Sequence, residues 1–151
     1  MLSLLVATLN VVALDTTRAY GGANPVFKVR YDGFISGQTL ATSDVSGSPT
    51  ITTIANAASP AGFYDIVPSQ SGTLYSNNYS FNFVNGKLNI GKAVVTVSAD
   101  DKIKVFGQSN PVLTASYSGF VNGENFASSG ITGAYALSTT AATGSDVGKY
   151  P

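Results

Sequence analysis

Carboxylates, lysines and tyrosines are the side chains left for acid–base or nucleophilic chemistry, because no histidine and no cysteine occurs among the 151 residues. Histidine is the commonest general base and zinc ligand, and cysteine supplies thiolates for catalysis and metal binding. Only Asp100 and Asp101 are adjacent acids, and adjacent residues at a strand end point to opposite sides. The sequence therefore predicts no catalytic residue, no cofactor and no enzymatic activity.

The distribution of charge restricts the partners. Eight basic and eight acidic side chains cancel to a net charge of zero and are scattered along the chain, with Asp100-Asp101 as the one adjacent acidic pair. No basic face is therefore expected for nucleic acid or for an anionic membrane surface. Neither an acidic calcium loop nor a calcium-binding nonapeptide repeat occurs, so no metal site is predicted.

One cluster has the composition of a glycan-binding surface. Tyr75, Asn77, Asn78 and Tyr79 bring aromatic rings and amide groups close together. A structural interpretation is the stronger of the two, because Tyr79 begins an alternating strand and asparagine is an ordinary turn residue. Both interpretations stay open, and these four residues are the ligand-binding candidates.

A long internal repeat organises the chain around these residues. Residues 20–34 read YGGANPVFKVRYDGF and return as FGQSNPVLTASYSGF at an offset of about 86 residues, without a gap. About 19 of roughly 58 aligned positions are identical, several times more than chance would give. The sequence thus predicts a complete repeat over residues 1–92 and a second repeat over residues 93–151 that is C-terminally truncated. Without a Gly/Ser- or Pro-rich linker between them, the junction is expected to be stiff.

The two copies share a turn signature that we interpret as structural. It comprises Tyr20, Gly21, Asn24 and Pro25 in the first copy and Phe106, Gly107, Asn110 and Pro111 in the second. The aromatic residue is expected to plug the core against the glycine turn, and the asparagine to cap the turn through its side chain. Lys28 and Arg30 are expected on a solvated face.

Alternation of apolar and polar residues predicts strands throughout. The expected strands in the first copy cover residues 8–15, 27–32, 50–54, 63–67, 79–84 and 87–90, with counterparts of the first two at 94–101 and 113–118. Asn85-Gly86 between two alternating runs predicts a type I′ hairpin. No segment has a sustained helical period, so the fold is expected to be mostly β.

The first residues lack the features of a targeting segment. Residues 1–14 are apolar, but no basic residue precedes Arg18 and the run is too short to span a membrane. We interpret this segment as the first strand and Met1 as an internal start in a longer reading frame. No membrane insertion is expected here.

The order of the signature residues resembles the MBG domain of the YGX type. Both copies read [FY]-G-x-x-N-P-x-[LF]-x-x-x-Y-x-G-F-x-x-G and later S-x-x-G-x-Y, and the first ends in NYSFNFVNGKLNI. The resemblance departs at Phe106, where the family usually has Tyr, and at Leu14-Asp15, which stands against Asp100-Asp101.

The resemblance implies tandem, small, β-rich modules with a β-grasp-like two-layer arrangement, in large secreted bacterial proteins of adhesin-like or filamentous-haemagglutinin-like type. The strand pattern itself allows an immunoglobulin-like sandwich as an alternative. The expected function is a non-enzymatic spacer at the cell surface, in contact with neighbouring repeats of the same chain. The alternative is a module that binds carbohydrate or mucin, with host or extracellular glycans and glycoproteins as partners.

Overall fold

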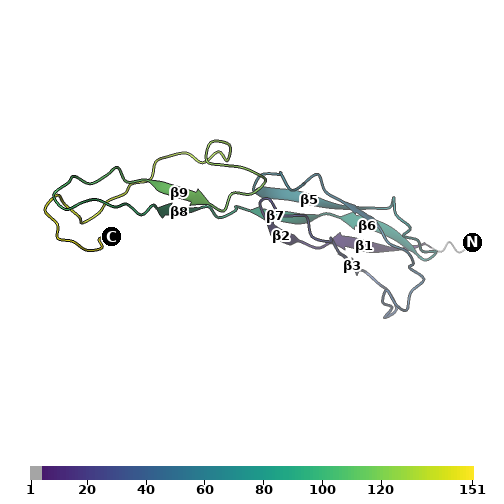
Figure 1. The fold of residues 1–151 in the computed structure, drawn as a ribbon. Helices are drawn as coiled ribbons and strands as arrows, with labels where there is room; N and C mark the ends of the chain where they lie inside the picture. Colours follow the sequence, from purple (N-terminus) through teal and green to yellow (C-terminus); the bar gives the residue numbers. More distant parts are fainter. Residues whose placement is uncertain (1–4) are drawn as a thin grey trace, which may run out of the picture. The chain divides into compact units, whose positions relative to one another are not determined.

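The computed structural model describes residues 5–151, which form strands, turns and extended segments without a helix (Figure 1). The prediction of a mostly-β fold is therefore confirmed. The chain divides between Lys92 and Ala93 into two compact units, which we call unit 1 and unit 2. Our interpretation of Met1 concerns a residue outside the described part.

Unit 1 contains a three-stranded sheet in the order β3-β1-β6. Its strands are β1 (Ala7–Ala13), β3 (Val29–Asp32) and β6 (Tyr79–Val84). β1 pairs with β3 in the antiparallel and with β6 in the parallel orientation. The inward positions of β1 alternate, as a strand requires, and its buried residues Leu9 and Val11 join a cluster with Val45, Leu74 and Tyr79.

A four-stranded sheet in the order β2-β7-β5-β4 completes unit 1. Its strands are β2 (Thr16–Ala19), β4 (Thr50–Thr52), β5 (Gly62–Ser69) and β7 (Gly86–Gly91). β2 lies parallel to β7, whereas β5 pairs with both β7 and β4 in the antiparallel orientation. A second buried cluster contains Ala13, Ala55, Ile66, Leu88 and Ile90. The two parallel pairs distinguish this topology from the antiparallel immunoglobulin-like sandwich.

The first two strands of unit 1, β1 and β2, lie parallel to its last two strands, β6 and β7. This parallel alignment runs from one sheet into the other. Ala7 pairs with Tyr79 and Ala19 pairs with Gly91, so the offset of 72 residues persists from the first sheet into the second. β2 was not predicted from the sequence, because its residues Thr-Thr-Arg-Ala carry no apolar alternation. Pairing with β7 in tertiary structure makes this segment a strand.

The predicted hairpin at Asn85-Gly86 is wrong. β6 and β7 are consecutive segments in different sheets, and their partners are β1 and β2 rather than each other. Neither residue has the positive φ that a type I′ turn needs. Gly86 serves a different purpose, because a Cβ there would lie 2.6 Å from the carbonyl oxygen of Ala13. The glycine allows the two backbones to approach where the strands pass between sheets.

Unit 2 contains two antiparallel strands, β8 (Thr96–Ala99) and β9 (Ala115–Ser118). Their register repeats that of β1 and β3, since Val97 faces Tyr117 as Val11 faces Tyr31. The rings around Tyr117 belong to Phe120, Phe126 and Tyr135, with centroids 4.7–6.4 Å away. The repeat in sequence is therefore also a repeat in strand pairing.

Candidate functional site

The predicted glycan-binding cluster lies in a loop that is tied to a second loop of unit 1. Ser46 and Tyr75 form an isolated antiparallel bridge, with 2.9 Å between N and O in both directions. The carboxylate of Asp44 accepts hydrogen bonds from the Ser76 hydroxyl and from the backbone N–H of Asn77, both at 2.7 Å. These bonds connect the two loops directly.

The four candidate residues of this loop differ in accessibility. Tyr75 is 57% exposed, and its hydroxyl donates to Oδ1 of Asn77 at 2.7 Å. Asn77 and Asn78 are also exposed. Tyr79 is only 4% exposed; its ring packs edge-on against Phe34 and its hydroxyl donates to Gln38. The surface available to a ligand therefore consists of Tyr75, Asn77 and Asn78, and Tyr79 belongs to the core.

Hydrogen bonding shifts the titration of the Asp44 carboxyl. The pKa of Asp44 is lowered from its usual value, chiefly because the Ser76 hydroxyl donates to the carboxylate. Partial desolvation opposes this effect, and donors from Asn77 and Asn78 add to it. Stabilisation of the charged form by donors is the physical cause. The loop that carries Tyr75 is thus anchored on an ionised side chain.

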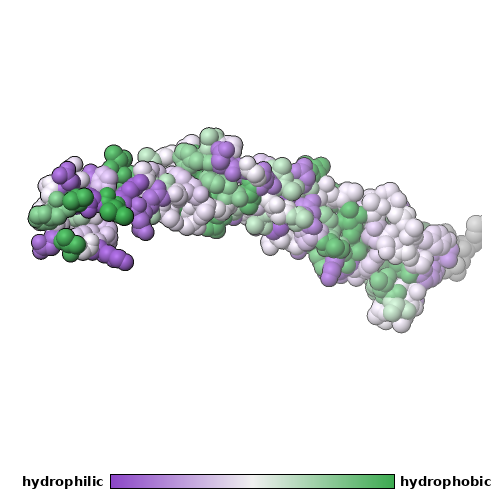
Figure 2. Space-filling model, in the orientation of Figure 1, coloured by the Kyte–Doolittle hydropathy of each residue, from purple (hydrophilic) through white to green (hydrophobic). Residues whose placement is uncertain are grey.

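A shallow groove on unit 1 was not foreseen from the sequence. It lies over β4, β5 and the start of β7, and Thr52, Thr53, Ile54, Phe63, Tyr64, Asp65, Val67 and Lys87 line it. Phe63 is 74% exposed, beside an ion pair of 2.5 Å between Lys87 and Asp65. The available signal was the outward position of Phe63 in the alternation of β5. Figure 2 shows exposed apolar residues in several separate patches on the visible face.

The turn signature has the same geometry in both units. Gly21 and Gly107 both have a φ of 81°, in the region that favours glycine. The side-chain amides of Asn24 and Asn110 donate to the carbonyl oxygens of Ala55 and Ala141, each at 2.7 Å. The asparagines that precede Pro25 and Pro111 therefore tie together segments 31 residues apart, where we expected a local cap.

The aromatic residue of the signature behaves differently in the two units. Tyr20 packs against the cluster around Leu88 and Ile90, whereas Phe106 is 61% exposed. The expectation that Phe106 plugs a core is thus corrected by its exposure. The cluster against which Tyr20 packs contains Leu88 and Ile90 of β7, and positions 86 residues after these two lie outside the given sequence.

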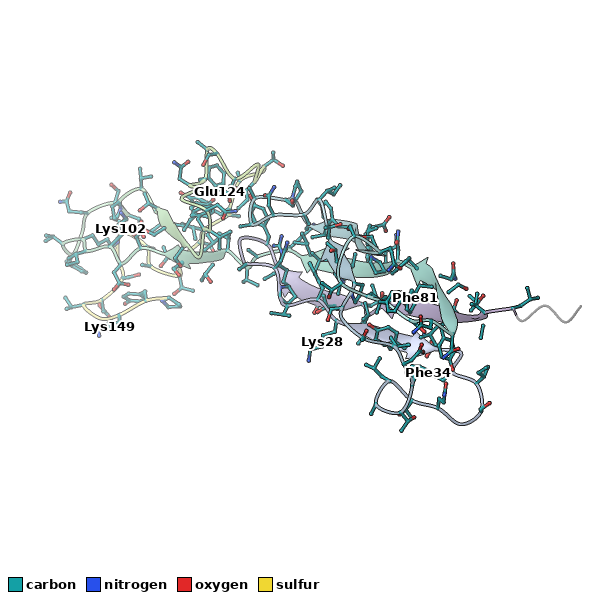
Figure 3. All side chains as sticks on the ribbon, turned by 90° about the vertical axis from the view of Figure 1, so that its right-hand side faces the viewer. Lys28, Phe34, Phe81, Lys102, Glu124 and Lys149 are labelled. Carbon is teal, nitrogen blue, oxygen red and sulfur yellow. The ribbon has the colours of Figure 1, made fainter. Side chains whose placement is uncertain are left out.

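The basic residues of β3 and its preceding loop lie outside the core. Lys28 is exposed, and Figure 3 shows its side chain pointing away from unit 1. Arg30 forms an ion pair of 2.6 Å with Asp32, and both side chains are largely solvent-accessible. Phe34 and Phe81, also labelled in Figure 3, instead pack against the cluster around Leu9.

One of the two adjacent acids, Asp100, is held by hydroxyl groups of unit 2. Asp100 accepts hydrogen bonds from Thr114 and Ser116, which lie across the sheet on the β9 side. Its pKa is lowered, first by the Ser116 hydroxyl and then by that of Thr114. Unit 1 has Leu14, Lys28 and Arg30 at the corresponding positions. The hydrogen-bonded Asp100 is therefore particular to unit 2.

Within residues 5–151, no group of three or more acidic, histidine or cysteine side chains lies together in a way that could hold a metal ion. No helix in this part of the chain is long and apolar enough to cross a membrane.

Fold, register and turn geometry define a tandem array of small β-rich repeat modules. The family with which the chain agrees is the MBG domain (YGX type), whose sequence profile matches residues 9–89 and again residues 95–151. These two matches cover most of the 151 residues, and the chain therefore belongs to this family. No curated protein and no solved structure matched it.

Proposed function

We propose that this chain is a non-enzymatic spacer segment of an extracellular bacterial surface protein, of the adhesin-like type in which such modules are arranged in tandem. The proposal is supported chiefly by the reproduction of one register in both units, β1 with β3 and β8 with β9. A repeated scaffold needs no catalytic site, because its useful property is the length that each copy adds.

The path of the chain through unit 1 supports a role in extension. β1 and β2 run from Ala7 to Ala19 alongside β6 and β7, which end at Gly91. At about 3.3 Å per residue, this alignment is roughly 40 Å long. The chain therefore enters and leaves unit 1 at opposite ends of the parallel run. Each inserted repeat would move whatever follows it by about that distance.

The junction supports the same role. β7 ends at Gly91, and only Lys92 separates it from the first residue of unit 2. A junction this short has far fewer accessible conformations than a long Gly/Ser linker. Repeats joined in this way would transmit their length along the array.

The spacer role is tested by measuring how length grows with repeat number. We would join one, two and three copies of residues 7–92 through the native junction sequence and record small-angle X-ray scattering. The maximum dimension should rise by about 40 Å with each copy. A much smaller rise, following the square-root growth of a flexible chain, would contradict the proposal.

Surface location needs its own experiment. Antibodies raised against residues 1–151 should label intact cells of the source bacterium. Labelling that requires lysis of the cells would place the protein inside and would remove the extracellular part of the proposal, while leaving the spacer role testable by scattering.

A second candidate function is binding of carbohydrate or mucin. The observation that favours it is the exposed Tyr75 ring beside the Asn77 and Asn78 amides, because aromatic faces and amides are the groups that contact sugars. A glycan array probed with the whole chain tests it. Reproducible binding that Tyr75→Ala abolishes and Tyr75→Phe preserves would establish this function. Absence of binding, or binding unaffected by Tyr75→Ala, would remove this loop as the site.

A further inference from the structure

The arrangement of the first and last strands points to a mechanical function. We propose that unit 1 is a force-bearing clamp: tension along the chain loads the hydrogen bonds between β1–β2 and β6–β7 in shear. This inference is independent of the glycan question and of cellular location. It goes beyond spacing, because a spacer need only hold its length, whereas a clamp resists being pulled apart.

The orientation of the strands determines how tension reaches the hydrogen bonds. In a parallel pair, the start of one strand lies beside the start of the other. Ala7 therefore lies beside Tyr79, and Ala19 lies beside Gly91 at the far end. Tension enters at the start of β1 and leaves at the end of β7 (Figure 1). It slides the two paired segments past each other, and their hydrogen bonds must yield together.

Backbone hydrogen bonds close both ends of this alignment. At the entry, the N–H of Ala7 donates to the carbonyl of Asn78 at 3.0 Å. At the exit, the N–H of Tyr20 donates to the carbonyl of Gly91 at 2.8 Å. The loaded segment therefore includes the bonds at its two extremes, where fraying would otherwise begin.

The point where the alignment passes between the two sheets is also bonded. There the N–H of Lys87 donates to Oδ1 of Asp15 at 2.7 Å. Close backbone approach at Gly86 keeps the strands together at the same place. Asp15 thus bridges the interruption between the two ladders, so the two sheets act as one continuous connection.

Burial protects the clamp from water. Leu9 and Val11 of β1 and Leu88 and Ile90 of β7 are among the most buried side chains of the chain. Water that replaces a strand–strand hydrogen bond lowers the cost of breaking it, and buried neighbours restrict its access. The elements outside the tension path, β3, β4 and β5, are connected by loops and carry no direct load.

Single-molecule force spectroscopy on the whole chain tests this inference. Since the protein contains no cysteine, a pair of introduced cysteines gives two unique attachment points. Val6→Cys with Lys92→Cys loads the alignment in shear, because both residues are exposed and lie just outside its ends. Val6→Cys with Asn78→Cys pulls on the same strands from one end, so that β1 peels from β6 one bond at a time.

The expected result is an unfolding force at least about twofold higher in shear than in peeling, because forced unfolding reports the barrier along the loaded path. Equal forces in the two geometries, or a higher force in peeling, would overturn the clamp. The two double-cysteine variants must have the same urea midpoint, so that a difference in unfolding force does not come from a difference in stability. If Asn78→Cys disturbs the loop anchored by Asp44, Ser80→Cys provides a second peeling site with the same expectation.

Discussion

Asn24 and Asn110 make the same long-range hydrogen bond in the two units, each to a carbonyl oxygen 31 residues further along the chain. In unit 1 the asparagine is also an acceptor, because Nε of Arg18 donates to its Oδ1 at 2.8 Å. Arg18 and Lys104 occupy equivalent positions in the two units. Each donates to the carbonyl oxygen of the residue after the one that the asparagine binds: Arg18 to that of Asn56, and Lys104 to that of Ala142. The turn signature therefore encodes a tie between distant loops.

Removal of this tie should destabilise unit 1. Asn24→Ala takes the donor from the carbonyl of Ala55, whose residue is buried. We expect a loss of about 1–2 kcal/mol in the free energy of unfolding, the usual cost of an unmet buried acceptor. Urea denaturation of the whole chain measures it. Asn82→Ala is the matched control, because the exposed Asn82 side chain donates a hydrogen bond to Oδ1 of the half-buried Asn10, and it should change stability by less than about 0.5 kcal/mol.

The bridge between the two parallel ladders gives a second prediction. Asp15→Ala removes the acceptor for the backbone N–H of Lys87, and we expect a loss of about 1–2 kcal/mol in unfolding free energy. Asp65→Ala is the control at the same partner, since the Asp65 carboxylate forms an exposed ion pair with the ammonium of Lys87. Exposed ion pairs contribute little. Equal losses for the two variants in urea titrations would contradict a special role for Asp15.

Acidification should weaken the anchor of the Tyr75 loop. The pKa of Asp44 is lowered in the folded protein, chiefly by the Ser76 hydroxyl. The ionised carboxylate therefore contributes stability above the unfolded-state pKa of about 3.9. This contribution is lost as the pH falls through the lower folded-state pKa. Urea midpoints between about pH 6 and pH 2 should fall more steeply for the natural chain than for Asp44→Asn. Parallel curves would exclude Asp44 as a source of the acid sensitivity.

Unit 1 should fold without unit 2. It contains both buried clusters of the described residues, whereas unit 2 has one pair of short strands. We expect residues 7–92 alone to unfold in one cooperative transition. The whole chain should show that transition together with a weak signal of lower stability from residues 93–151. An unfolded 7–92 fragment, with a single steeper transition for the whole chain, would mean that the 151 residues form one domain.

Local signals in the sequence were sufficient for the repeat, the mostly-β class and most strand positions. Alternation such as that of Tyr79, Phe81 and Phe83 reports which side of a strand is buried, whatever its partner. Turn glycines could also be predicted from the sequence, because a positive φ is a property of a single residue. Gly33 and Gly119 both have a positive φ.

Local signals did not show which strands pair with each other. Asn85-Gly86 has the composition of a hairpin turn, yet β6 and β7 pair with β1 and β2, which lie 72 residues earlier. That outcome depends on burying Leu88 and Ile90 in the same cluster as Ala13. β2 was missed for the same reason, since its polar residues become a strand only through β7.

The candidate site was likewise predicted only in part from the sequence. Residue types alone placed Tyr75, Asn77, Asn78 and Tyr79 together, because all four lie in one short segment. Only the tertiary structure separated them: Tyr79 is buried against Phe34, while Tyr75 faces solvent on a loop held by Asp44. The sequence by itself determined the period and the strands, which depend on neighbouring residues. The tertiary structure decided pairing and exposure, because both depend on which distant apolar surfaces are buried together.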